Sequence, residues 1–404
     1  MKKFILLCTF CWGMLVPGAR ACTSFLAGRN ATIDGSTFIT YAADSHTLYG
    51  ALKFIPAARH PKNSTMEIRE WDTNKLLGHI PQVEYTYKVV GNMNEHQLSI
   101  TESTWGGRPE LVDTTGIIDY GSLMYIALQR AKTAREAITV MTDLVSEYGY
   151  YSSGESFSIA DPEEVWIMEM IGKGPQNQGA VWVAVRIPDD CIAAHANQSR
   201  IHKFPLDDKE NCLYSPDVIS FAREQGYFNG LNKDFSFADA YAPADFGALR
   251  GCEARVWSFY NRFNSSMGKY LSYLNGKSKE YLPLYIKPDK KLSVQDMKDA
   301  MRDHFEGTPF DMTQDVGAGP FKCPYRFRPM TFKVDSVEYT NERAVATQQT
   351  AFTLVAQMRS WLPNAIGGVL WFGVDDTNTC VYVPLYACLN EVPECYSELN
   401  GSMY

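Results

Sequence analysis

The chain has 404 residues, of which 45% are hydrophobic, 13% aromatic and 21% charged. This composition excludes a disordered or collagen-like chain. A formal net charge of -8, without any run of Lys or Arg, argues against a nucleic-acid-binding protein. We therefore expect a folded protein with no nucleic-acid partner.

The first 21 residues have the pattern of an export signal. Lys2 and Lys3 precede an uncharged, mostly apolar run, residues 4–16, which is too short to span a bilayer comfortably. Small residues at Ala19 and Ala21 then precede a predicted cleavage point. We expect this segment to be removed and the chain to be exported to the periplasm or the extracellular space. The rest of the sequence contains no apolar stretch long enough to predict a membrane span.

Cleavage after Ala21 would make Cys22 the first residue of the mature chain. A thiol and a free α-amine would then share one residue. An α-amine has a reference pKa of about 7.7–8.0, so it can accept a proton near neutral pH. A nucleophile activated by an adjacent terminal amine is an established catalytic design. Cys22 is therefore a candidate nucleophile, although a disulfide-bonded or lipid-anchored cysteine would occupy the same position.

Two regular elements are predicted with clear boundaries. Short apolar runs at residues 23–27 and 38–42, with an Asp-Gly turn signal at 34–35, predict a β-hairpin that begins directly after Cys22. A capping box at residues 133–136 predicts the start of a helix, in which apolar side chains recur every three or four residues until Gly149 ends it.

The remaining predicted elements follow in blocks. We expect strands at residues 165–171, 181–187, 192–196, 367–372 and 380–386. We expect helices at residues 215–226, 293–305 and 344–361. Runs of strands and runs of helices predict an α+β fold. Because no Pro/Ser-rich linker divides residues 22–404, we expect one domain with helical insertions.

The region from Cys22 onward resembles the C69 peptidases, the dipeptidase branch of the N-terminal-nucleophile hydrolases. A Cys-Thr pair, a short strand, an Asp-Gly-Ser turn at residues 34–36 and an acidic residue follow one another, as in that family. The resemblance continues in four blocks, which lie in the same order along the chain. These blocks are residues 157–171, 182–201, 251–263 and 371–386.

The resemblance implies a four-layer αββα sandwich, in which two antiparallel sheets lie between helix layers. It also implies hydrolysis of dipeptides or other short peptides through an acyl-enzyme on Cys22. The α-amine of Cys22 would be the base, and Arg255 or an acidic residue would recognise the termini of the peptide substrate. The sequence leaves open whether the chain forms a homo-oligomer.

The resemblance also suggests roles for other residues. Asp44 matches an acid that holds the amine or the thiol, and Asn197 matches an amide that donates to the oxyanion. Thr104, which ends the segment 101–104, matches a residue that lines the site, and Arg255 matches an arginine near it. Tyr41 stands where many relatives have an arginine, so we expect less electrostatic stabilisation of the thiolate.

Three other interpretations have less support. An acyl-amide hydrolase of the penicillin V or bile-salt type would use the same nucleophile, and a lipid-anchored binding protein would use Cys22 only for attachment. His195 and His202 would permit a Cys–His pair, but neither has an independent signal. The sequence has no His-Glu-x-x-His and no pairs of Cys and His at metal-ligand spacing, so we expect no metal and no cofactor.

Overall fold

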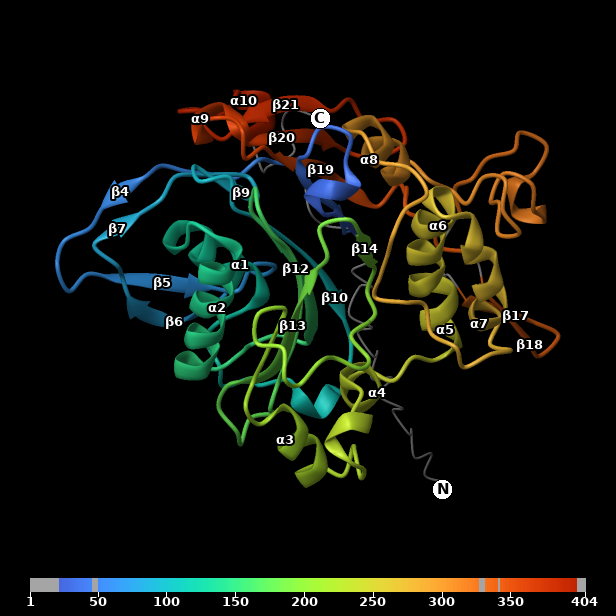
Figure 1. Ribbon diagram of the computed structural model, residues 1–404, viewed down its shortest axis with the longest axis horizontal. Helices are drawn as coiled ribbons and strands as arrows, with labels where there is room; N and C mark the ends of the chain where they lie inside the picture. Colours follow the sequence, from blue (N-terminus) through green and yellow to red (C-terminus); the bar gives the residue numbers. More distant parts are fainter. Residues whose placement is uncertain (1–21, 46–49, 327–330, 341, 398–404) are drawn as a thin grey trace, which may run out of the picture.

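A computed structural model describes residues 22–45, 50–326, 331–340 and 342–397 (Figure 1). The predicted export signal lies outside the described residues. Most of the described strands belong to two large antiparallel sheets, which confirms the α+β class.

The first sheet has seven strands in the order β16-β14-β1-β2-β19-β20-β21. Its strands are β1 (Ser24–Ala27), β2 (Thr37–Asp44), β14 (Ile192–His195), β16 (Tyr285–Ile286), β19 (Thr350–Met358), β20 (Val369–Val374) and β21 (Val383–Tyr386). The expected hairpin is confirmed, because β1 pairs with β2 through Leu26 opposite Ile39 and Ala27 opposite Phe38.

The second sheet has eight strands in the order β15-β13-β12-β11-β10-β9-β8-β3. Its strands are β3 (Phe54–Ile55), β8 (Val89–Val90), β9 (Met93–Asn94), β10 (Ser99–Trp105), β11 (Gly154–Ala160), β12 (Val165–Gly172), β13 (Ala180–Ile187) and β15 (Cys212–Tyr214). Three separate hairpin pairs complete the strands: β4 (Ala58–Arg59) with β7 (Tyr85–Thr86), β5 (Thr65–Arg69) with β6 (Leu76–Pro81), and β17 (Thr331–Val334) with β18 (Val337–Thr340).

The two sheets lie against each other, and helices contact both. The α-helices are α1 (Tyr120–Arg130), α2 (Ala134–Tyr148), α3 (Val218–Glu224), α4 (Phe237–Tyr241), α5 (Phe246–Ala248), α6 (Ala254–Phe263), α7 (Leu271–Leu274), α8 (Val294–Met301), α9 (Asn364–Gly367) and α10 (Glu394–Ser397). Strand β2 contacts β10 and β11 across the interior. Helices α1 and α2 contact the eight-stranded sheet, whereas α6 and α8 contact the seven-stranded sheet (Figure 1).

Local signals explain where helix α2 begins and ends. The Thr133 side chain accepts a hydrogen bond from the Glu136 backbone N–H, and Gly149 leaves the helix with a φ of 75°. Only glycine adopts that conformation without strain. Helices α3 and α8 also lie within the predicted segments 215–226 and 293–305, but both are shorter than expected.

The predicted helix at residues 344–361 is wrong. Residues Thr350–Met358 form strand β19, which lies between β2 and β20 in the middle of the first sheet. Nearly every residue of β19 is buried. A strand buried on both faces has a continuous apolar run, which periodicity alone does not distinguish from a buried helix. The β-branched and aromatic residues within the run, such as Phe352 and Val355, favour the strand.

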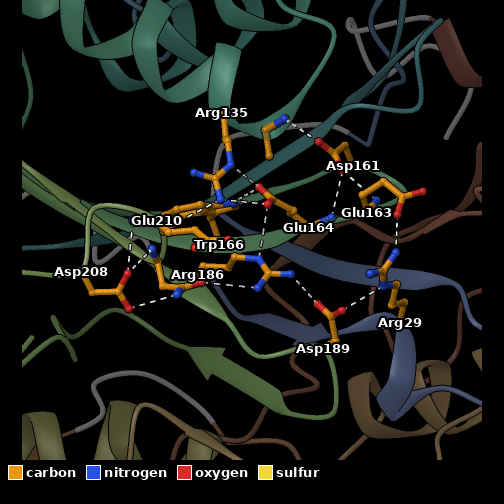
Figure 2. Close-up of polar contacts among 12 residues, drawn as sticks. Arg29, Arg135, Asp161, Glu163, Glu164, Trp166, Arg186, Asp189, Asp208 and Glu210 are labelled. Carbon is orange, nitrogen blue, oxygen red and sulfur yellow. Dashed lines mark hydrogen bonds and ion pairs between the residues drawn. The ribbon is translucent and has the colours of Figure 1, made fainter. Parts of the chain in front are cut away.

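Ion pairs connect α2 to the end of strand β1 (Figure 2). Arg135 contacts Glu164 at 2.8 Å, and Glu164 contacts Arg186 at 3.4 Å. Arg186 in turn contacts Asp189 at 2.7 Å, and Asp189 contacts Arg29 at 2.9 Å. Arg135 lies on α2, Arg186 on β13 of the second sheet, and Arg29 in the short turn that follows β1, so the network holds the loop after β1 against the second sheet.

Within the described residues, no helix is both long enough and apolar enough to cross a membrane.

Candidate active site

Cys22 lies at the start of the first sheet, directly before strand β1. Thr23 forms a backbone bridge to Ala42 on β2, and this bridge fixes the chain beside Cys22. The Cys22 side chain is buried, yet it lines a small pocket. The same pocket is lined by residues of β2, β10 and α1. The strands therefore place the candidate nucleophile at the inner wall of a small pocket.

Two polar side chains meet the thiol. The Cys22 Sγ lies 3.5 Å from Glu102 Oε1 and 3.8 Å from the Tyr41 hydroxyl. The Tyr41 hydroxyl donates a short hydrogen bond to the same Glu102 oxygen. Tyr41 comes from β2 and Glu102 from β10, so this cluster spans the two sheets.

The surroundings of Cys22 keep the thiol protonated. Burial raises the pKa of Cys22 well above its ordinary value, and the negative charges of Glu102 and Asp44 raise it further. Hydrogen bonds from the Asp44 backbone and from Tyr41 act in the opposite direction. A thiol in this state is a weak nucleophile until a base removes its proton.

Arg255 on α6 holds the Cys22 backbone in place. Its guanidinium donates to the Cys22 carbonyl oxygen at 2.8 Å and to Thr23 Oγ1 at 2.7 Å. The other N–H groups donate to the oxygens of Ala196, Asn197 and Gly251, at distances of 3.1, 2.9 and 2.8 Å. An arginine has five N–H donors, so each one has a protein acceptor. Arg255 thus orients Cys22 and Asn197 with donors that all have acceptors within the protein.

Asn197 lies behind the pocket in a left-handed conformation with a φ of 60°. Its Nδ2 donates to the Thr104 carbonyl oxygen at 2.6 Å, and its Oδ1 accepts from Arg255. These two contacts fix the direction of the side-chain amide. Thr104 itself lines the pocket beside Cys22.

Asp44 lines the pocket, but its carboxylate contacts an arginine and a threonine. It forms a short ion pair with Arg343 and accepts from Thr350 Oγ1 at 2.6 Å. Burial raises the pKa of Asp44, and the charge of Arg343 opposes this shift. Arg343 is 299 positions further along the chain, and no local pattern in the sequence pairs the two residues.

Three of the five predicted site residues line the pocket, namely Cys22, Asp44 and Thr104, while Asn197 and Arg255 contact them from behind. The sequence does not single out Glu102, although it lies in the segment 101–104 that ends at the predicted site residue Thr104. His195 does not contact Cys22; its ring nitrogens contact Ser103 Oγ at 2.6 Å and Ser158 Oγ at 2.7 Å.

Comparison with known proteins gives the family that the sequence resembles, and the match covers most of the chain. The profile of peptidase family C69 matches residues 54–404. A probable dipeptidase of Latilactobacillus sakei is 27% identical, over 95% of this chain and 77% of its own length. A probable dipeptidase of Salmonella dublin is also 27% identical, over 96% of this chain and 85% of its own length. Dipeptidase A of Lactobacillus helveticus is 24% identical, over 93% of this chain and 77% of its own length.

Proposed function

The chain belongs to peptidase family C69, and from this premise we propose that it is an exported cysteine hydrolase that cleaves dipeptides. Cys22, freed by removal of residues 1–21, would be both the nucleophile and the source of the base. The relatives named dipeptidase support the substrate class. The observation that carries the mechanism is the buried Cys22 thiol in the pocket, beside a main chain that Arg255 fixes.

The fold we propose for this enzyme is the four-layer αββα sandwich of N-terminal-nucleophile hydrolases. The contacts of α1 and α2 with one sheet and of α6 and α8 with the other support it. The same fold would bring the mature N-terminus to the pocket, where a free α-amine is needed.

The reaction would proceed in two stages. The α-amine of Cys22 takes the proton from the thiol, and Sγ forms a bond to the carbonyl carbon of the substrate. The C–N bond then breaks as the proton passes to the leaving amino group, which leaves a thioester on Cys22. A water molecule, deprotonated by the same amine, attacks the thioester and releases the second product.

The remaining residues would position these groups. Arg255 fixes the Cys22 carbonyl and the Asn197 amide, and Asn197 would donate its remaining amide hydrogen to the oxyanion. Asp44 would hold the α-amine, with its carboxylate kept in place by Arg343 and Thr350. The second candidate, an acyl-amide hydrolase, would use the same groups, so a screen of dipeptides against acyl amides separates the two.

Replacement of the nucleophile tests the mechanism. We expect Cys22→Ala to lose about 1,000-fold or more in kcat/KM for a dipeptide, because no other group forms the thioester. Cys212→Ala is the control, since Cys212 is a buried thiol on the edge strand β15 and does not line the pocket. Dipeptidase activity that survives in Cys22→Ala would contradict the proposal.

The state of the N-terminus gives an independent test. Intact mass should show a mature protein that begins at Cys22, and a form that keeps Met before Cys22 should be inactive because its amine is an amide. Full activity of the Met-Cys22 form would exclude the α-amine as the base. A lipid-sized mass increment on Cys22 would favour the anchored binding protein instead.

A further inference from the structure

The pocket beside Cys22 is electrostatically suited to a cation. Three carboxylates line it, those of Asp44, Asp72 and Glu102, and none of its described lining residues is Lys or Arg. Arg343 balances the charge of Asp44 from outside this lining. Asp72 accepts a hydrogen bond from the Tyr120 hydroxyl at 3.0 Å. The carboxylate of Glu102 in this lining favours a positively charged group on a bound ligand.

Glu102 has a buried oxygen available for such a group. The residue is 1% exposed, and its Oε1 is occupied by the Tyr41 hydroxyl and the Cys22 thiol. Its Oε2 is buried and has no hydrogen-bond partner among the described residues. A buried carboxylate oxygen without a donor costs free energy, so the arrangement is complete only when a donor binds.

The distance of Glu102 from the nucleophile matches the geometry of a dipeptide. The α-nitrogen of a dipeptide lies about 2.5 Å from its first carbonyl carbon. That carbon must approach Sγ to about 3–3.5 Å before attack. Glu102 Oε1 is 3.5 Å from Sγ, so the same carboxylate is within reach of the α-nitrogen while Sγ faces the carbon.

We propose that Glu102, held by the Tyr41 hydroxyl, binds the α-ammonium group of the substrate and thereby makes a free amino terminus a requirement for cleavage. This inference rests on the proposed function. In place of the arginine expected at position 41, the pocket then receives a positive charge from the substrate itself. N-acylated dipeptides lack this charge and leave Glu102 without its partner.

One competing role for Glu102 must be separated from this one. In this role, the α-amine of the mature Cys22 is the donor that Oε2 lacks. In that case Glu102 would support the base, and its loss would affect every substrate to the same extent. Recognition of the substrate would instead affect only substrates with a free amine.

The test compares dialanine with N-acetyl-dialanine as substrates of the full mature protein. We expect the wild type to prefer dialanine by about 100-fold in kcat/KM, as for a hydrogen bond to a charged group. In Glu102→Gln this preference should fall by about tenfold or more. Glu84→Gln, a change of the same kind at an exposed position, is the control and should keep the wild-type preference.

Two results would overturn the inference while leaving the proposed function intact. One is a wild type that cleaves both substrates equally well. The other is a Glu102→Gln variant that loses the same factor on both substrates, because that result assigns Glu102 to the amine of Cys22. A wild type that cleaves no dipeptide at all would instead contradict the proposed function.

Binding gives a measurement that does not depend on turnover. In calorimetry, Cys22→Ala should bind dialanine about tenfold or more tightly than the double variant Cys22→Ala/Glu102→Gln. Equal affinities would overturn the inference, whatever the activity of the wild type. Thermal unfolding of each variant checks that it is folded.

Discussion

Arg255 and the Asp44–Arg343 pair form the buried polar framework around Cys22. Arg255 contacts the Cys22 carbonyl, and Arg343 contacts the Asp44 carboxylate. Arg343 and Asp44 are both nearly inaccessible to solvent, with side chains 5% and 1% exposed. A buried ion pair contributes little net stability compared with apolar residues, but loss of one partner leaves an uncompensated buried charge.

The stability of Asp44 variants should depend on this ion pair. Asp44→Asn should lower the free energy of unfolding by about 3–5 kcal/mol, because Arg343 loses the carboxylate that balances its buried charge. Asp44→Asn/Arg343→Met should recover a large part of that loss, since the uncompensated charge is removed. Urea unfolding of the wild type, both single variants and the double variant measures the coupling. If the changes in unfolding free energy of the two single variants simply add up in the double variant, the two residues are not coupled and the prediction is contradicted.

At the scale of elements, the position of strand β1 depends on a close approach of two loops. Gly28 follows β1, and its N–H donates to the Cys191 carbonyl oxygen at 3.0 Å. A Cβ atom on Gly28 would lie 2.5 Å from the carbonyl oxygen of Asp189. That loop is held by the ion pairs of Asp189 with Arg29 and Arg186, so it has little freedom to move away (Figure 2).

Gly28→Ala should therefore destabilise the protein by about 1–3 kcal/mol, as expected when a side chain is forced into a filled space. Gly268→Ala is the matched control, because a Cβ atom there meets nothing within 4 Å. Thermal and urea unfolding compare the two variants. Equal stability of both would show that the loop of Asp189 moves without cost.

At the scale of the whole molecule, His195 connects the two sheets. It lies on β14 of the first sheet, while its ring contacts Ser103 on β10 and Ser158 on β11 of the second. Burial and then the positive charge of Arg200 lower the pKa of His195 to about 3. The ring is therefore neutral in the folded protein throughout the range in which a free histidine gains a proton.

A pH dependence of stability follows. Because the folded pKa is depressed, the unfolded chain binds a proton below about pH 6.5 that the folded chain does not bind. The contribution of His195 is complete above pH 6.5 and is lost as the pH falls toward 3. When the pH falls from 6 to 5, the free energy of unfolding of His195→Asn should decrease by about 1 kcal/mol less than that of the wild type.

Urea unfolding at a series of pH values measures this difference in slope, which is independent of the absolute stability of the variant. His79→Asn, at an exposed position, is the control for the substitution itself. The same slope in wild type and His195→Asn would contradict a buried neutral His195.

Local patterns determined the α+β class, the hairpin after Cys22, helix α2 with its cap, and Cys22 itself as the candidate nucleophile, because turns, caps and periodicity depend on neighbours in the chain. The tertiary structure decided what those patterns do not encode. Whether residues 350–358 form a strand depends on their place between β2 and β20. Arg343 reaches Asp44 across 299 positions, and Glu102 reaches Cys22 across 80, only because the two sheets bring them together. The composition predicts a folded acidic chain, and the fold concentrates part of that negative charge around one thiol.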